Sequence, residues 1–366
     1  MKTTLLAFTL VALTILLLPA QTVSHKSSSD PAQVLSTAKE SDSAFAIIEI
    51  GENHRVWQRV VTETNEFGKV VSTTNSFTEL QTGLYYQSGP GDKWLETKAE
   101  IELLADGAAA TNGPHKVFFA ANLNAVGAIS LTTPEGQLLR SRVFGLSYFD
   151  AATGKAVLIA ETKDSIGQLI YPNQVIYTNA FDDVSADTQY FYTKAGLEQN
   201  IVVRAQLPDP AEFGMSRETA ILQVLTEFYD SPVAERKPLG LQATGLRDEV
   251  VDFGRMKMAR GKAFSVGDET ARAKSVPVAK QWVVLSGRTF LVEEVPFKLV
   301  DAQLQTLTKP KRTAGLKPRL QGKGENIAAA LLSMLPKRTA SHTRGVVRLA
   351  KLDTQKQPAL CWITRF

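Results

Sequence analysis

Short apolar and β-branched runs, separated by turn residues roughly every eight to twelve positions, dominate the chain from residue 43 to residue 207. The runs are rich in Val, Ile, Thr, Tyr and Phe, which suit pleated, half-buried strands. Strand-like and helix-like segments do not alternate there, which argues against a parallel α/β sheet. The pattern predicts a mainly β protein, built as an antiparallel β-sandwich or as barrel-like sheets.

Breaks in this pattern divide the chain into predicted segments. Residues 43–207 form the first β-rich domain, and two prolines and a glycine then open a junction that we place at 208–245. Residues 246–305 form a second β unit that ends in a short helix. Residues 306–366 are basic and rich in Pro and Gly, which predicts a largely disordered linker or tail. The expected architecture is therefore two β modules followed by this tail.

One segment of the junction, residues 219–229, fits two structures. Ile221, Val224, Leu225 and Phe228 match one face of a helix, whereas alternate residues match one face of a strand. Because β-type segments flank it on both sides, the strand is the preferred interpretation.

The amino terminus has the layout of a secretory signal peptide over residues 1–24. Lys2 supplies a positive start, Leu5–Leu18 is an apolar run of 14 residues, and small residues suited to cleavage follow. The run is shorter than the about 20 residues of a membrane span. A polar leader at 25–42 precedes the first domain. We expect an exported bacterial protein, extracellular or on the cell surface with the periplasm as an alternative, and no membrane span after cleavage.

Charge and cysteine content concern mainly the carboxyl-terminal segment. Residues 301–366 hold 13 Lys and Arg against three Asp and Glu, while the remaining 300 residues hold 28 against 34. Aromatic residues that could stack on bases are sparse in this basic segment, so we predict no nucleic-acid partner. Cys361, the only cysteine, excludes an intramolecular disulfide.

Cys361 and Trp362 are unusual residues for a solvated tail. We expect that nothing near them buries either side chain, and that the chain is truncated and the start of a longer protein. The alternative is a genuine tail whose Cys361 and Trp362 dock onto the body or onto a partner.

Motifs for the common catalytic chemistries are absent from the sequence. The four histidines lack the close spacing of a zinc site, and we expect His54 and His115 to be turn or edge residues. No nucleophile elbow or phosphate-binding loop occurs. We therefore predict no catalytic residue, no cofactor and no metal ligand, and favour a non-enzymatic protein.

Paired carboxylates are the remaining catalytic candidates. Glu293-Glu294 and Asp182-Asp183 are adjacent pairs, but neighbours on a strand point to opposite faces of the sheet. An adjacent pair therefore does not form the facing dyad of a glycosidase. We expect these groups to be solvated loop carboxylates.

Aromatic and acidic residues of the late strands are candidate ligand contacts. The tyrosines could stack on sugars, although core packing is the preferred interpretation, and the aspartates could gather oxygens for calcium, although the calcium-loop pattern is absent. The candidates are Tyr171, Tyr177, Tyr190, Tyr192, Asp182, Asp183 and Asp187.

Three turns share a polar residue shortly before a Gly, then Lys or Gln, then apolar residues: "TNEFGKVVSTT", "TPEGQLLRS" and "YFDAATGKAVLIAET", around Gly68, Gly136 and Gly154. They resemble the core of YD repeats, whose hairpins build β shells in RHS-type secreted bacterial proteins. The order of signal peptide, two β modules and basic linker is similar to the amino-terminal region of such proteins, over residues 43–305. The resemblance implies no catalytic residue.

Together these features predict a non-enzymatic exported β module that acts as a scaffold or surface-contact region of a larger secreted bacterial protein. The expected partner is a cell-surface polysaccharide or another extracellular protein. The alternative is a carbohydrate-binding or carbohydrate-hydrolysing protein with an aromatic and carboxylate face.

Overall fold

The structure, a computed structural model, describes residues 44–266, 275–310, 320–335, 345–351 and 358–366. The predicted signal peptide and polar leader lie outside these residues. The chain divides into two units. The described part of the smaller unit is residues 60–73, and the larger unit comprises residues 44–59 and 74–366.

Most described elements are antiparallel strands, which confirms the predicted mainly β fold. One small sheet has the order β1 (Ala46–Gly51), β2 (His54–Thr64) and β3 (Val70–Leu80). A second consists of β4 (Tyr85–Tyr86) and β5 (Leu95–Glu96), and a third of β17 (Glu235–Leu241), β18 (Arg247–Asp252) and β19 (Lys257–Met258).

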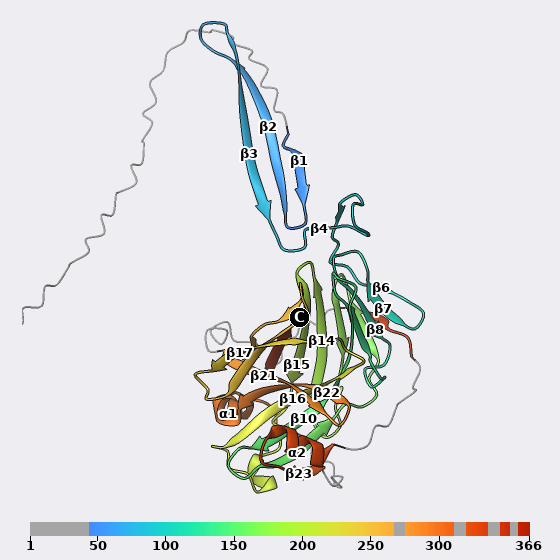
Figure 1. Cartoon of the computed structure of the whole chain (residues 1–366), viewed down its shortest axis with the longest axis vertical. Coiled ribbons are helices and arrows are strands. Elements are labelled where there is room, and N and C mark those ends of the chain that lie inside the picture. Colours follow the sequence, from blue (N-terminus) through green and yellow to red (C-terminus); the bar gives the residue numbers. More distant parts are fainter. Residues whose placement is uncertain (1–43, 267–274, 311–319, 336–344, 352–357) are drawn as a thin grey trace, which may run out of the picture. The chain divides into compact units, whose positions relative to one another are not determined.

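The other strands form one barrel-like sheet within the larger unit (Figure 1). They are β6 (Glu102–Leu103), β7 (Gly107–Ala110), β8 (Lys116–Ala120), β9 (Ile129–Thr132), β10 (Leu138–Asp150), β11 (Lys155–Glu161), β12 (Gly167–Ile170), β13 (Gln174–Tyr177), β14 (Ala186–Thr193), β15 (Gly196–Val203), β16 (Ala220–Tyr229), β20 (Gly261–Val266), β21 (Val276–Leu285), β22 (Arg288–Pro296), β23 (Gln321–Lys323), β24 (Arg348–Ala350) and β25 (Ala359–Arg365).

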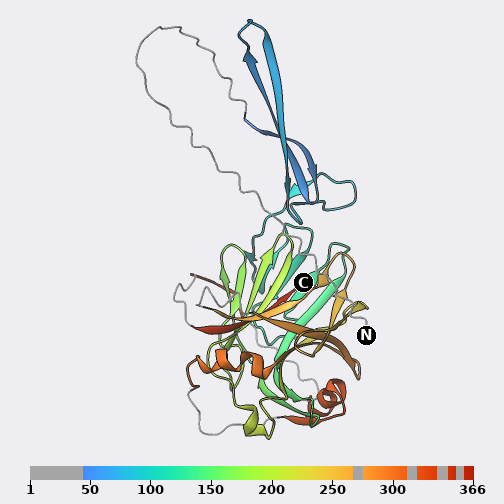
Figure 2. The ribbon, with the colours of Figure 1, turned by 90° about the vertical axis from the view of Figure 1, so that its left-hand side faces the viewer.

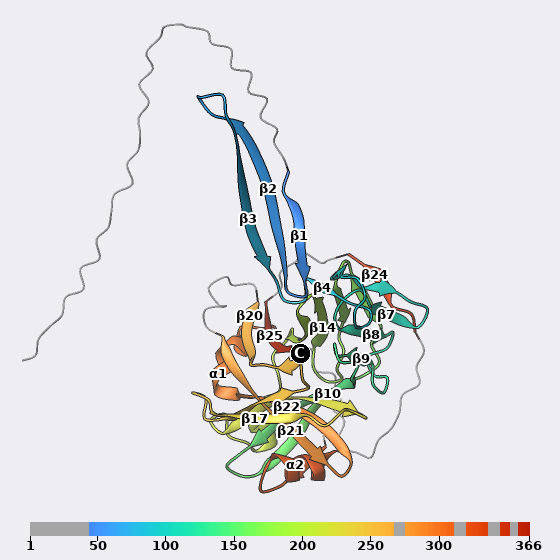
Figure 3. The same ribbon diagram turned by 45° about the horizontal axis from the view of Figure 1, so that its top comes forward.

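Among the described residues, three short helical elements accompany the strands: the 3-10 turn η1 (Pro210–Phe213), α1 (Phe297–Gln305) and α2 (Ile327–Met334). The helices α1 and α2 lie apart from one another, as the views in Figures 1, 2 and 3 agree. The predicted helix at the end of the second β unit is α1. The Asn326 side chain accepts the Ala329 amide and so begins α2.

Strand β16 pairs with β10 and β22 and is buried along its whole length. Leu222 and Val224 face the main core, whereas Ile221 and Leu225 face a second apolar layer that includes Leu331 of α2. A strand covered on both faces reads as an almost continuous apolar run, which explains why its sequence also fitted a helix. The strand interpretation of residues 219–229 is confirmed.

The predicted junction does not separate two β modules. Strand β16 lies inside residues 208–245, yet it pairs with β10 on one side and β22 on the other, joining both predicted units in one sheet. The prolines and glycine mark only a local turn: Asp209 caps η1 and Gly214 ends it with φ +67°. Turn signals therefore indicated a break in local structure rather than a domain boundary.

The expectation of a largely disordered tail is wrong for part of residues 306–366. Strand β25 lies between β15 and β20, where Trp362 is opposite both Ile201 and Ala263. Cys361 and Trp362 are both buried, so the alternative in which they dock onto the body is the one found. The high charge, averaged over the segment, masked a short apolar strand. Within the predicted tail, residues 311–319, 336–344 and 352–357 lie outside the described residues.

The three turns that share the glycine motif are all β-hairpins. Gly136 (φ +82°) joins β9 to β10, and Gly154 (φ +69°) joins β10 to β11. Gly68 (φ +74°) lies in the smaller unit, where its amide donates to the Asn65 carbonyl. Glycine adopts these positive φ values without the steric cost of a side chain, so the shared motif has a local physical cause.

Candidate functional site

The predicted aromatic contacts do not form a face. Tyr177, Tyr190 and Tyr192 are buried in the main core, as the preferred interpretation had it, and Tyr171 is 63% exposed. The hydroxyl of Tyr177 donates to the Ala120 carbonyl at 2.6 Å. Burial raises the pKa of all three core tyrosines. Their rings are therefore packing elements that no ligand can reach.

The predicted acidic contacts have local partners. Asp182 accepts a hydrogen bond from the Glu161 amide at 2.6 Å, and Asp187 accepts one from Arg204 Nε at 2.9 Å. Asp183 occupies a turn at φ +52°. Within the described residues, no group of three or more His, Cys, Asp or Glu side chains could hold a metal ion. Asp182 and Asp187 therefore link loops to strands, Asp187 through the Asn179 amide at 2.8 Å.

The two histidines that the structure describes differ in environment. His54 begins β2, and its Nε2 lies 3.1 Å from Glu49. His115 lies in the bend before β8 and packs against Tyr192, with ring centroids 4.7 Å apart. Burial lowers the pKa of His115 to about 4, so the ring is neutral at physiological pH.

The adjacent pair Glu293 and Glu294 points to opposite faces of β22, as predicted, but the expectation of solvated carboxylates is wrong for both. Each is almost completely buried. On one face, Gln223 and Gln281 donate amide hydrogens to Glu294 at 2.9 and 2.8 Å, and the Ser147 hydroxyl donates to Gln223 at 2.7 Å. Burial raises the pKa of Glu294 to about 7 in spite of these two donors.

On the other face, Glu293 accepts the Thr364 hydroxyl at 2.5 Å and lies directly opposite Lys280 in the sheet. Burial raises its pKa to about 7, and Thr364 and Lys280 offset only part of that effect. The Lys280 Nζ is 3.1 Å from Asp248, and both of these side chains are buried too. The sequence signal for this network was the pair of glutamates inside the apolar run "FLVEEVPF".

These buried groups are arranged as structural cross-links. Glu294 is held by donors from β16 and β21, the two strands that flank β22, Glu293 accepts from Thr364 of β25, and both carboxyl groups are closed off from solvent. A substrate cannot reach them in this conformation, so the raised pKa values belong to a polar network inside the sheet.

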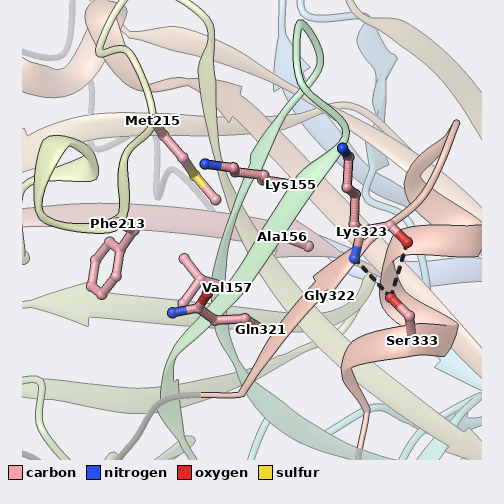
Figure 4. Close-up of a pocket in the computed structure, with 9 residues that line it drawn as sticks. All are labelled: Lys155, Ala156, Val157, Phe213, Met215, Gln321, Gly322, Lys323 and Ser333. Carbon is pink, nitrogen blue, oxygen red and sulfur yellow. Dashed lines mark hydrogen bonds between the residues drawn. The ribbon is translucent and has the colours of Figure 1, made fainter.

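A cavity of about 480 Å³ lies beside β11, β23 and α2 (Figure 4). Lys155 and Lys323 line it, but their ammonium groups point in different directions in Figure 4. The Ser333 hydroxyl already bonds to the Lys323 backbone at 2.9 and 3.2 Å. The polar groups of this cavity therefore do not converge on one ligand position.

A more distinctive surface belongs to the small sheet β1–β2–β3. Residues directly opposite one another in antiparallel strands share a face, which places Ile47 with Trp57 and Ile50 with Arg55. Side-chain contacts add further members to that face. We call this set the aromatic face; it consists of Phe45, Ile47, Ile50, Arg55, Trp57, Arg59, Phe77 and Glu79.

The three rings of the aromatic face are in contact: Phe77 meets Phe45 edge-on, at an interplanar angle of 68°, and is stacked with Trp57. Phe77 lies 5.1 Å from Phe45 and 6.1 Å from Trp57, the latter at an interplanar angle of 18°. The guanidinium groups of Arg55 and Arg59 each lie 4.8 Å from a ring centroid, over Trp57 and Phe45. Cation–π and ring contacts thus hold together a sheet that has little buried core.

Glu79 is the carboxylate of this face. It accepts Arg55 Nε at 2.6 Å, Arg55 Nη2 at 3.1 Å and Trp57 Nε1 at 3.0 Å. The hydrogen bond from Arg55 lowers the pKa of Glu79, and the same bond raises the pKa of Arg55.

Much of the aromatic face is open to solvent. Ile47 and Ile50 are each 38% exposed and Phe77 is 50% exposed. The sequence predicted these strands, but not the face, because the face depends on the register of three strands. Its local signal was the alternation in "RVWQRVVTET".

Comparisons with protein-family models, with curated proteins and with solved structures found no match. Among the helices that the structure describes, none is long and apolar enough to cross a membrane.

Proposed function

We infer that this protein is a non-enzymatic exported β module that acts as a surface-contact region of a larger secreted bacterial protein, and that it makes contact through the aromatic face. The observation that carries this proposal is the exposure of Ile47, Ile50 and Phe77 together on one face of a sheet. Contiguous exposed apolar residues of this kind mark interaction sites in soluble proteins, whereas single exposed apolar residues do not.

The interior supports a scaffold rather than a catalyst. The carboxylates with raised pKa values are enclosed, and their donors come from different strands of one sheet. Such a network suits a rigid support for an exposed contact surface.

The test is binding of the purified exported protein to cells of the organism that encodes it. We expect the double variant Trp57→Ser, Phe77→Ser to lose most binding. The matched control is Val284→Ser, which removes an exposed apolar residue of the barrel-like sheet. Equal binding by the wild type, the double variant and the control contradicts the proposal.

A carbohydrate-binding function is the second candidate, because the nearly parallel rings of Trp57 and Phe77 have the arrangement that sugar rings stack on. A glycan array probed with the wild type and with Trp57→Ser tests it. Saturable binding of a glycan that the variant loses would support this function over contact with a protein.

A further inference from the structure

We propose that the partner of the aromatic face is a protein surface on which apolar side chains surround one carboxylate, and that Arg59 binds that carboxylate. This inference rests on the proposed function and names the chemistry of the partner.

The two arginines of the aromatic face differ in their bonding. Arg55 is held by Glu79 at 2.6 Å and also lies 3.5 Å from Glu96. Arg59 lies over Phe45, its Nε is buried, and neither a hydrogen-bond partner for that nitrogen nor an ion pair for the side chain occurs among the described residues. A partly buried guanidinium without an acceptor is unfavourable.

A carboxylate is the group that best meets this need. The guanidinium presents a planar set of N–H donors that matches two carboxylate oxygens, and such charge-assisted bonds are among the strongest in proteins. With Arg55 neutralised by Glu79, Arg59 is the charge of the aromatic face left to be matched by a partner.

The apolar members of the face favour a protein over a polysaccharide. Ile47 and Ile50 lie on the same face as the rings and offer no hydrogen bond to sugar hydroxyls. The faces of Trp57 and Phe45 are also engaged by guanidinium groups at 4.8 Å, which competes with stacking of a sugar ring. Apolar side chains of a protein surface can pack on such a face as one sheet packs on another.

A second copy of this chain fits the face less well. In a two-fold dimer formed by two aromatic faces, Arg59 of each copy needs a free carboxylate on the other. The carboxylate that the face offers is Glu79, which already accepts three hydrogen bonds from Arg55 and Trp57. Face-to-face pairing would therefore bury Arg59 without an acid.

A library of random 12-residue peptides displayed on phage, selected on the immobilised full chain, tests the partner chemistry. We expect the enriched peptides to carry Asp or Glu between apolar residues. Arg59→Gln should weaken their binding about tenfold or more. Arg59→Glu should shift the selection toward peptides with Lys or Arg. Arg260→Gln, which removes an exposed arginine elsewhere, should leave binding unchanged.

Different results would contradict the proposed contact surface and the inferred carboxylate of the partner. If Phe77→Ser abolishes binding of the selected peptides while Arg59→Gln and Arg59→Glu have no effect, the inferred carboxylate is wrong and the contact surface stands. If peptides bind equally to the wild type and to Phe77→Ser, the aromatic face is not the contact surface. A concentration-dependent dimer that Phe77→Ser dissociates in analytical ultracentrifugation, or a glycan bound in place of any peptide, also overturns the inference. Unchanged thermal unfolding of each variant shows that the loss is local.

Discussion

Gln223 on β16 donates its side-chain amide to Glu294 on β22 at 2.9 Å, and both side chains are completely buried. Ser147 on β10 extends the row, because it is directly opposite Gln223, as Gln223 is opposite Glu294. Three central strands are therefore linked through side chains as well as through their backbones. The carboxyl group that ends the row has its pKa raised to about 7 by burial.

The first prediction concerns pH. In the folded protein Glu293 and Glu294 keep their protons up to about pH 7, whereas in the unfolded chain they ionise near 4.5. The folded state therefore binds more protons between these values, and the free energy of unfolding falls as the pH rises through them. His115, with its pKa lowered to about 4, has the opposite effect, but only between about pH 4 and 6.5.

Of these three groups, only the carboxyl groups of Glu293 and Glu294 still titrate above pH 6.5. We expect the free energy of unfolding in urea to fall by about 1–3 kcal/mol between pH 6 and pH 8. Glu294→Gln should reduce this fall, while Glu66→Gln, at an exposed position, should not. A stability that rises between pH 6 and pH 8 contradicts the raised pKa values.

The second prediction concerns the buried pair of Lys280 and Asp248, whose charged atoms are 3.1 Å apart. Lys280→Met should lower the free energy of unfolding by about 3–5 kcal/mol, because it leaves a buried carboxylate without its counter-charge. The double variant Lys280→Met, Asp248→Asn should recover part of the loss. Urea unfolding of both variants measures the difference, and a double variant less stable than the single one argues against charge as the cause.

The third prediction concerns the strand β25. Trp362→Ala should lower the free energy of unfolding by about 3–5 kcal/mol, because the indole is buried in the main core. Trp94→Ala removes the same side chain from a position that is 36% exposed and should cost much less. Equal thermal stabilities of the two variants would falsify the docking of β25 into the sheet.

The fourth prediction compares two hairpin glycines with similar positive φ. A Cβ on Gly154 would lie 2.3 Å from the Gly324 carbonyl oxygen, whereas a Cβ on Gly136 meets nothing within 4 Å. Gly136→Ala therefore carries only the backbone strain, of about 1 kcal/mol. Gly154→Ala should destabilise the protein by more, since β23 must move away from β11. Thermal unfolding of the two variants distinguishes a shared turn preference from this close approach.

The sequence by itself determined the local elements of this protein. The hairpin of β10 and β11 follows from a polar turn around Gly154 between two apolar runs, and the hairpin of β21 and β22 from Ser286-Gly287 at φ +47° and +78°. The glycine positions and the alternation of side chains act over a few residues, so they are visible without knowing the rest of the fold.

Only the tertiary structure decided which strands are neighbours, and with them the fate of the side chains. The sequence predicted a solvated Glu294, but Gln223 of β16 lies directly opposite it and donates to it. It also predicted Trp362 to be part of a tail, but β25 pairs with β15 on one side and with β20 on the other. The aromatic face likewise exists because Phe77 meets Trp57 and Phe45 from other strands. Burial depends on contacts between residues far apart in the chain, and a local sequence pattern does not predict those contacts.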